Sequence, residues 1–215
     1  MNAATKNLVS QYRKTKPLIK KRLAEFKHLR KARNEDIFSE LCYCILTANA
    51  NALLCDKAIK ELQAKDLLLE GSAMQIRPAL KGKARFHNKK ARFIVTARNV
   101  FRCDGSIDIK RHLEGRDIID TRDWLVKNIK GFGYKESSHF LRNIGLGKDI
   151  AILDRHILKN LKKYGVINKV PSSIGNRTSY IEIEDRMRRF AKKVNVPLEE
   201  LDLLLWSIET GFIFK

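Results

Sequence analysis

The chain has 215 residues, of which 44% are hydrophobic and 32% charged. This composition is typical of a folded protein with one sizeable core or two small subdomains sharing a cleft, and it excludes a disordered tail. The 44 Lys+Arg against 24 Asp+Glu leave a formal net charge of +20, which favours a polyanion such as nucleic acid as the partner.

Apolar residues recur at helical spacing along nearly the whole chain. Strand-like alternation is confined to fragments such as Ser106–Ile109, which are too short to build a sheet. Glycine and proline mark the loops between the helical patterns, and Pro197 is placed to begin a helix with Glu199 and Glu200 in its first turn. The predicted helices include, in chain order, Leu18–Phe26, Ile37–Leu46, Leu53–Leu62, Phe93–Phe101, Trp124–Ile129, Phe140–Ile144 and Leu201–Ile208. The sequence therefore predicts an all-α fold.

No apolar run approaches the roughly 18–20 residues of a membrane-spanning helix. The segment Met1–Lys16 is polar and lacks the apolar centre of a secretory signal, so we expect a cytoplasmic protein with no membrane partner. The cysteines have neither zinc-ligand nor disulfide-framework spacing, and we expect buried thiols at Cys42, Cys44, Cys55 and Cys103.

The segment Ile129–Lys135 lies between two helical patterns and reads Ile-Lys-Gly-Phe-Gly-Tyr-Lys. Gly131 and Gly133 allow a tight hairpin that a side chain at either position would obstruct. Such a turn exposes backbone N–H groups at the start of the next helix, where they form an anion site suited to a DNA phosphate. Taken alone, the pattern is equally compatible with an ordinary turn between helices.

Two signatures then occur in sequence. The stretch from Ile129 through Leu141 resembles the hairpin of the helix–hairpin–helix DNA glycosylases, the HhH-GPD superfamily. Ile152–Ile157 resembles the second signature of that superfamily, in which an aspartate precedes a histidine and an apolar residue by short fixed steps. The wording of Gly131–Asn143, of Leu41–Ala52 and of the chain's end most resembles the archaeal-type 8-oxoguanine DNA glycosylase/AP lyases.

The resemblance implies an architecture and an activity. It implies two helical subdomains with the active cleft between them: a helical barrel of residues 30–147 that contains the hairpin, and a second subdomain of residues 1–29 plus 148–215. It implies a monomeric base-excision-repair enzyme that acts on double-stranded DNA containing oxidised guanine. Such an enzyme removes 8-oxoguanine through a lysine Schiff base and then cleaves the strand by β-elimination.

The resemblance also assigns the two residues of the chemistry, Lys135 as nucleophile and Asp154 as carboxylate. An amine must be neutral to attack C1′ of the deoxyribose, and neighbouring cations such as Lys130 or Arg155 would favour that form. A carboxylate would stabilise positive charge on the sugar but would oppose the neutral amine, and the sequence leaves this competition open. Asp154 is also placed to cap a helix, and both roles can hold together.

The remaining site residues follow from the same comparison and from base flipping, since a base inside a duplex is out of reach. We expect phosphate contacts at Ile129, Gly131 and Gly133. We expect Asn49, Arg85 and Phe86 to fill the gap left by the flipped base, with the cations of the basic stretch 88–90 holding phosphates. Trp206 and Lys215 are the expected base-pocket residues. Asn49 as a polar helix end, and Phe86 and Trp206 as core residues, are the alternatives.

Cofactors are not expected. Relatives that act on oxidised pyrimidines hold an iron–sulfur cluster with four C-terminal cysteines, and no cysteine follows Cys103. We expect no metal held by side chains, although the family hairpin can hold a monovalent cation through its carbonyls. Two alternatives stay open: a glycosylase/lyase for another damaged or mismatched base, and a non-catalytic helix–hairpin–helix DNA-binding module.

Overall fold

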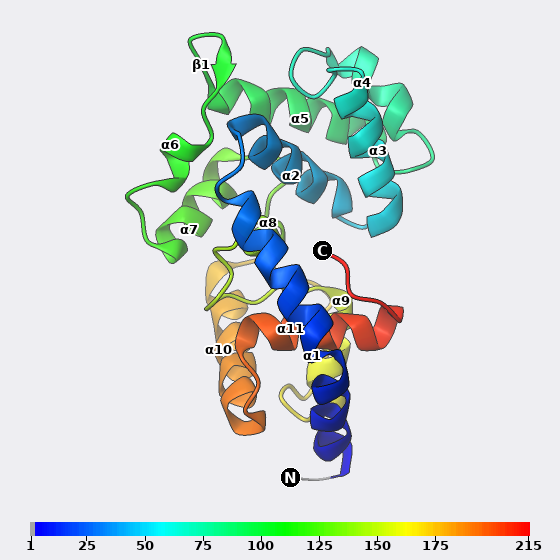
Figure 1. The fold of residues 1–215 in the computed structure, drawn as a ribbon, viewed down its shortest axis with the longest axis vertical. Helices are drawn as coiled ribbons and strands as arrows, with labels where there is room; N and C mark the ends of the chain where they lie inside the picture. Colours follow the sequence, from blue (N-terminus) through cyan, green and yellow to red (C-terminus); the bar gives the residue numbers. More distant parts are fainter. Residues whose placement is uncertain (1–2) are drawn as a thin grey trace. The chain divides into compact units, whose positions relative to one another are not determined.

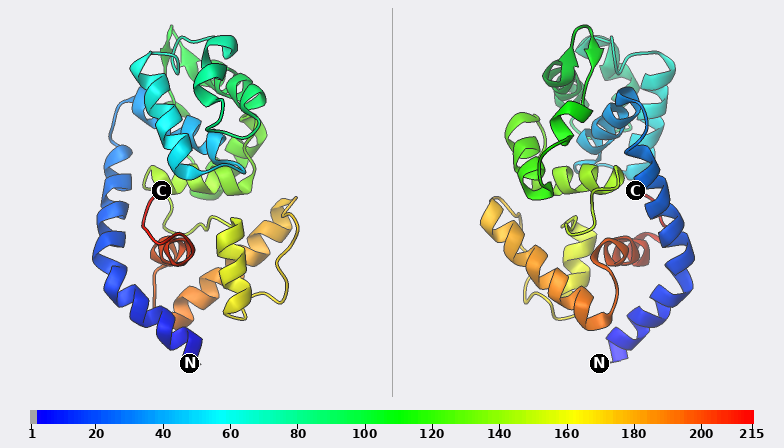
Figure 2. Two further views of the ribbon diagram at one scale, coloured as in Figure 1. Left: turned by 90° about the vertical axis from the view of Figure 1, so that its right-hand side faces the viewer. Right: turned by 60° about the vertical axis from the view of Figure 1, so that its left-hand side comes forward.

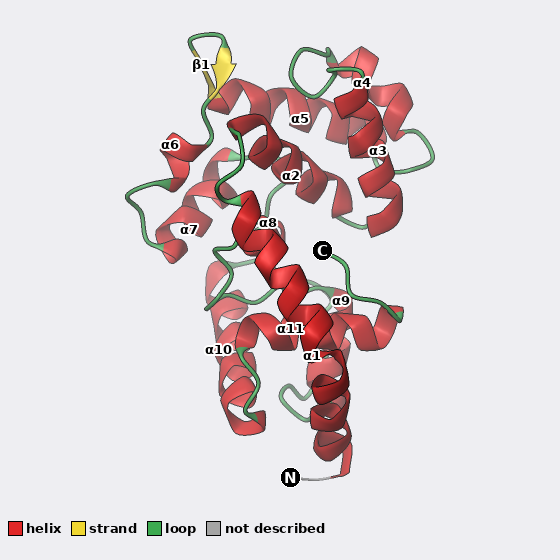
Figure 3. Cartoon of the chain, viewed as in Figure 1, coloured by secondary structure: helices red, strands yellow, loops and turns green. Residues whose placement is uncertain are grey.

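The computed structural model describes residues 3–215; Met1 and Asn2, the first residues of the polar N-terminal segment, lie outside the described residues. Within this range the chain is helical apart from its loops and one hairpin of two-residue strands (Figure 3), which confirms the all-α prediction. Among the same residues, no helix combines the length and apolar character that crossing a membrane requires.

The chain forms two compact units: Leu29–Phe140, and the residues up to His28 together with Leu141–Lys215. The boundary between Phe140 and Leu141 falls within a helix rather than in a linker. The subdomain limits drawn from the sequence, 30–147 against 1–29 plus 148–215, stay a prediction.

The unit Leu29–Phe140 is built around α2, which is apolar on nearly all sides and buried over Ile37–Thr47. Helix α2 packs against α3 and α5, and α4 packs against α3 and α5 in turn (Figures 1 and 2). The elements of this unit are α2 (Asn34–Thr47), α3 (Ala52–Ala64), α4 (Ala73–Leu80), α5 (His87–Phe101), β1 (Arg102–Cys103), β2 (Ser106–Ile107), α6 (Lys110–Leu113), α7 (Ile118–Asn128) and the start of α8 (Tyr134–Asn143).

The strands β1 and β2 pair antiparallel, Arg102 opposite Ile107 and Cys103 opposite Ser106. The alternation at Ser106–Ile109 therefore produced a hairpin and no larger sheet, as its length predicts. Cys103 in this hairpin is only half-buried, whereas the other three cysteines are buried. The expectation of four buried thiols was wrong for Cys103 because its strand lies at the edge of a two-stranded ribbon.

The other unit contains α1 (Ala3–Leu29, whose last residue belongs to the first unit), α9 (Arg155–Lys163), α10 (Arg177–Val194) and α11 (Leu198–Thr210). Helix α11 packs against both α9 and α10 (Figure 2). It begins after Pro197 with Glu199 and Glu200 in its first turn, as predicted. A buried hydrogen bond of 2.7 Å from the Tyr12 hydroxyl to Glu200 Oε2 links α1 to α11.

Candidate active site and DNA-contacting segments

The hairpin between α7 and α8 has one glycine that its geometry requires. Gly131 has φ of +90°, and a Cβ there would lie 2.6 Å from Cδ2 of Phe93. Gly133 has no positive φ, and a Cβ there would meet Glu136 Oε2 at 3.4 Å. The expectation that a side chain would obstruct either position is therefore confirmed for Gly131 and wrong for Gly133 within this chain.

The backbone of the hairpin is held by its own hydrogen bonds. The N–H of Phe132 donates to the Ile129 carbonyl at 3.1 Å, and the N–H of Ile129 closes α7 by donating to Leu125 at 2.9 Å. The N–H of Gly133 donates to Glu136 Oε2 at 3.2 Å. The phosphate contacts expected at Ile129, Gly131 and Gly133 stay predictions.

Lys135 is the second residue of α8, immediately after the hairpin. Its side chain is 23% exposed, and Nζ lies 3.7 Å from Oε1 of the neighbouring Glu136. One carboxylate therefore contacts both the hairpin N–H of Gly133 and the Lys135 amine. A partly buried amine at a helix start that remains accessible is the arrangement a lysine nucleophile needs.

The first turns of α8 are fixed by neighbouring helices. The buried Arg122 of α7 donates from Nη1 to Ser138 Oγ at 3.3 Å, and its guanidinium lies 5.9 Å from the centre of the Tyr134 ring. His139 packs edge-on against Tyr43 of α2, with ring centres 5.8 Å apart. The side chains of Tyr134 and Ser138 therefore contact α7, and that of His139 contacts α2, on the helix that carries Lys135.

Lys90 of α5 is a buried lysine in the same unit. It is 4% exposed, and its Nζ donates to the carbonyl of Leu46 at 2.7 Å and to that of Ala48 at 2.6 Å. Burial lowers the pKa of Lys90, with the Lys135 charge lowering it further and Cys55 and Glu136 opposing. The expectation that Lys90 holds a DNA phosphate was wrong, because its ammonium is committed to the end of α2.

The three gap-filling candidates lie on two turns of the unit Leu29–Phe140. Asn49 is exposed just after α2 with φ of 53°, and Phe86 precedes α5 with φ of 57°. Phe86 is 54% exposed, and the Arg85 guanidinium lies 5.1 Å from its ring centre. Phe86 is therefore not a core residue, although its gap-filling role is untested.

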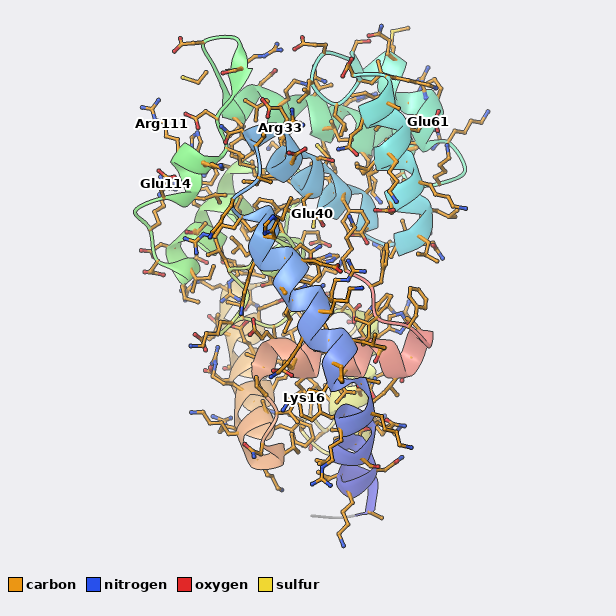
Figure 4. All side chains as sticks on the ribbon, viewed as in Figure 1. Lys16, Arg33, Glu40, Glu61, Arg111 and Glu114 are labelled. Atoms are coloured by element: carbon orange, nitrogen blue, oxygen red, sulfur yellow. The ribbon has the colours of Figure 1, made fainter. Side chains whose placement is uncertain are left out.

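The loop before Phe86 is tied to α3 through Glu61, which Figure 4 labels on that helix. Glu61 accepts from Lys83 Nζ at 2.6 Å and from Lys65 Nζ at 2.9 Å. These hydrogen bonds lower the pKa of Glu61 to about 2. Lys83 also donates to the Ala79 carbonyl at 3.1 Å, so the segment leading to Arg85 and Phe86 is anchored at its start.

In the other unit, Asp154 is the N-cap of α9. Its Oδ1 accepts from the N–H of Ile157 at 2.8 Å, which is the capping role expected from the sequence. The side chain is half-buried, and the first turn of α9 contains no acidic residue. A helix start therefore fixes the position of this carboxylate.

The extended segment before Asp154 is held by three buried polar side chains. The N–H groups of Ala151, Ile152 and Leu153 donate in turn to one acceptor each. These acceptors are Glu184 Oε1 at 2.7 Å, Asp202 Oδ1 at 3.3 Å and the Tyr180 hydroxyl at 3.1 Å. Tyr180 also donates to the Ala151 carbonyl at 2.7 Å. Helices α10 and α11 thereby determine where Asp154 begins α9.

The base-pocket candidates belong to the end of the same unit. Trp206 is half-buried on α11, and the ring of Phe212 stands edge-on to it with centres 5.3 Å apart. Phe214 continues this aromatic cluster at 6.1 Å from Phe212, one residue before the half-buried Lys215. The packed rings therefore run from Trp206 to Phe214, the residue before Lys215. The base-pocket roles of Trp206 and Lys215 stay predictions.

The fold and these residues place the chain in a class of proteins: helical proteins with a helix–hairpin–helix motif and a lysine at the start of the helix that follows the hairpin. A profile of the family described as 8-oxoguanine DNA glycosylase matches residues 19–196. An "8-oxoguanine DNA glycosylase/AP lyase" of Fusobacterium nucleatum is 43% identical over 206 residues, covering 95% of this chain and 94% of that one.

Solved structures agree. The crystal structure of Methanocaldococcus jannaschii 8-oxoguanine DNA glycosylase matches with a TM-score of 0.87 and 39% identity, covering 99% of this chain and 96% of that one. The same organism's glycosylase/lyase in complex with a 15mer DNA containing 8-oxoguanine matches with a TM-score of 0.85 and 39% identity, over 97% and 99%. The chain belongs to the 8-oxoguanine DNA glycosylase family.

Sequence reasoning missed two residues that shape this site. Glu136 has a sequence signal, because a glutamate three residues after the N-cap Gly133 is the pattern of a capping carboxylate. Lys90 has none, since its burial depends on where α5 meets the end of α2. A lysine in a basic stretch looks like a surface residue until its neighbours are known.

Proposed function

We propose that this chain removes 8-oxoguanine from duplex DNA and then cleaves the strand at the resulting site, with Lys135 as the nucleophile of the first step and its imine with the sugar as the intermediate of the second. The observation that carries the proposal is the position of Lys135. It is a partly exposed amine in the first turn after a glycine hairpin, in a chain that belongs to the 8-oxoguanine DNA glycosylase family.

In the first step, the neutral Lys135 amine attacks C1′ of the damaged nucleotide. The glycosidic bond between C1′ and the nitrogen of the base breaks. Its electron pair leaves with the base, which takes up a proton. The amine loses a proton, the bond between C1′ and the ring oxygen O4′ breaks as O4′ takes up a proton, and a protonated imine then joins Nζ to C1′. In the second step, loss of a proton from C2′ expels the 3′ phosphate, and water then releases the lysine.

Asp154 is the proposed carboxylate of this reaction. Positive charge develops on the sugar as the base leaves, and a carboxylate held in place stabilises it without reorganisation. The hydrogen bonds to Ala151, Ile152 and Leu153, together with the cap to Ile157, support this role by holding Asp154 in place.

We propose that Asn49, Arg85 and Phe86 occupy the gap left when the damaged base leaves the stack. Phe86 is a large exposed ring beside a cation, suited to wedge between bases. We propose Trp206 and Lys215 for the base pocket, since an aromatic face and a cation are the groups on which flipped purines stack. The phosphate contacts proposed at Ile129, Gly131 and Gly133 fit the exposed turn at Gly131.

We further propose that the protein acts as a monomer on cytoplasmic, nucleoid DNA and needs no resident cofactor. The hairpin carbonyls of Ile129 and Gly133 each accept one N–H and keep a second lone pair. These hard oxygens suit a monovalent cation, which would stiffen the hairpin and take no part in the bond changes.

The experiment that tests the lesion is strand cutting under single-turnover conditions. Duplexes with 8-oxoguanine opposite each of the four bases are compared with duplexes containing thymine glycol and with mismatched adenine. We expect the 8-oxoguanine strand to be cut fastest. Faster cutting of thymine glycol or of mismatched adenine would show that another lesion is the substrate.

A further inference from the structure

Lys90 links the two turns that carry the gap-filling candidates. Its side-chain Nζ donates to the carbonyl of Ala48, the residue before Asn49, at 2.6 Å. Its backbone N–H donates to the carbonyl of Phe86 itself at 3.1 Å. One residue therefore contacts both turns, although they lie on segments far apart in the sequence.

The contacts of Lys90 are those of a structural cation and not of a surface one. Its side chain is 4% exposed, and a buried ammonium is tolerated only where carbonyls or carboxylates solvate it. The last carbonyls of a helix have no intrahelical partner, so the end of α2 supplies such acceptors at Leu46 and Ala48. The Cys55 thiol of α3 adds a second donor to Leu46 at 3.3 Å.

Both turns have an uncommon backbone conformation. Asn49 and Phe86 have φ of 53° and 57°, in the left-handed region. Asparagine tolerates this region, but a bulky residue such as Phe86 adopts it only when its surroundings hold it there. The backbone N–H of Lys90 bonds to Phe86 in the first turn of α5, and its ammonium holds the end of α2 against that turn, so Lys90 joins the two segments.

We propose that Lys90 is a positioning residue that joins the Asn49 and Phe86 turns into one rigid element for insertion into the base stack of damaged DNA. The inference rests on the proposed function, because it presumes that these two turns enter the duplex. Lys90 touches no reacting atom in this account and acts through Asn49 and Phe86.

A second effect of Lys90 has to be separated from this one. Burial lowers the pKa of Lys90, and the charge of Lys135 lowers it further while Cys55 and Glu136 oppose this, so the Lys90 charge is coupled to that of Lys135. Loss of the Lys90 charge would also change the surroundings of the nucleophile. The two effects differ in the substrate they touch: gap filling matters only in a duplex, whereas the nucleophile is needed on any abasic sugar.

The test compares Lys90→Met with wild type on two substrates. The first is a duplex with 8-oxoguanine opposite cytosine, cut in single turnover. The second is a single-stranded oligonucleotide with a preformed abasic site, trapped by borohydride. We expect Lys90→Met to slow duplex excision roughly 10- to 100-fold, the scale of a small misplacement, while trapping on the single strand stays within about twofold. The exposed Lys57 of α3 is the matched control, and Lys57→Met should equal wild type on both.

Unchanged duplex excision by folded Lys90→Met would overturn the proposal. An equal loss on both substrates would overturn it too, because Lys90 would then act on the nucleophile. Absence of trapping by wild type, or full trapping by Lys135→Gln, is a different failure: it removes the proposed function and the inference with it, whatever Lys90→Met does.

Two further measurements keep the test decisive. In a double-mutant comparison, Lys90→Met combined with Phe86→Gly should be no slower on the duplex than the slower single variant, whereas multiplied losses would contradict action through Phe86. If circular dichroism shows that Lys90→Met does not fold, Lys90→Arg takes its place. It should lose more activity on the duplex than on the single-stranded abasic site, and equal effects would reject the proposal.

Discussion

At the scale of single residues, Asp154 has two roles that one side chain can serve. Its Oδ1 caps α9 through the N–H of Ile157, and its charge is proposed to stabilise the cationic sugar. A neutral amide can perform the first role but not the second, since asparagine is as good an N-cap as aspartate. The two roles can therefore be separated by substitution.

We predict that Asp154→Asn keeps the thermal midpoint within about 1 °C of wild type and lowers the single-turnover rate of 8-oxoguanine excision roughly 100-fold. Asp154→Ala should lose the same activity and also about 1 kcal/mol of unfolding free energy. Asp117→Asn is the matched control, because Asp117 caps α7 by accepting from Ile119 at 2.7 Å and is outside the proposed chemistry. Full excision activity in folded Asp154→Asn would remove the carboxylate from the mechanism.

Phe86 combines a strained backbone conformation with an exposed side chain, so its backbone destabilises the fold and its ring adds little packing in return. A left-handed conformation costs a non-glycine residue about 1–2 kcal/mol, and 54% exposure leaves little packing to lose. We predict that Phe86→Gly leaves the thermal midpoint unchanged or raises it by a few degrees, while duplex excision slows. Leu18→Gly, at an exposed site within α1, should lower the midpoint. A lowered midpoint in Phe86→Gly would show that the ring is a packing residue.

At the scale of elements, the hairpin and the helix α8 that follows it carry Lys135, the proposed nucleophile. Gly131 is needed for the turn to pass Phe93, whereas Gly133 has room for a methyl group in the free protein. The fold itself does not require glycine at position 133. A glycine there allows close approach of another molecule to the main chain, here the proposed DNA phosphate.

We therefore predict different results for two neighbouring substitutions. Gly131→Ala should destabilise the protein by about 1–3 kcal/mol, through both the positive φ and the clash with Phe93. Gly133→Ala should unfold within a few degrees of wild type but bind duplex DNA more weakly. Denaturation curves and fluorescence anisotropy measure the two effects. Equal stability losses would mean that the turn has no room at either position.

The sequence predicted elements better than contacts. Helical spacing located the helices around Leu53 and Leu201, and the glycines at 131 and 133 located the turn before α8, because these signals are local. Which face each helix buries was less clear: Leu18 and Leu53 belong to the apolar pattern yet are exposed. The hydrogen bonds from Lys90 to the end of α2 could not be predicted, because they join segments more than 40 residues apart and no local sequence pattern indicates which segments pack together.

At the scale of the whole molecule, the net charge of +20 is evident from the composition alone. Charge of this size attracts any DNA, damaged or not, and supports binding by release of counterions from the phosphates. Of the two residues proposed for the chemistry, Lys135 belongs to the unit Leu29–Phe140 and Asp154 to the other unit.

We predict a steep dependence of undamaged-duplex binding on salt. About six phosphate contacts would give a slope near −5 in a plot of log binding constant against log salt concentration. Anisotropy titrations between 50 and 200 mM salt, as typical working conditions, measure this slope. A slope flatter than about −2 would mean that most of the positive charge has no part in holding DNA.

The most direct measurement of the central claim is borohydride trapping of the wild type and Lys135→Gln in parallel on a duplex containing 8-oxoguanine. The wild type is predicted to form a covalent protein–DNA adduct, because reduction fixes the imine between Nζ and C1′. Folded Lys135→Gln is predicted to form none. An undiminished adduct in Lys135→Gln, or no adduct with the wild type, would contradict the assignment of Lys135 as the nucleophile.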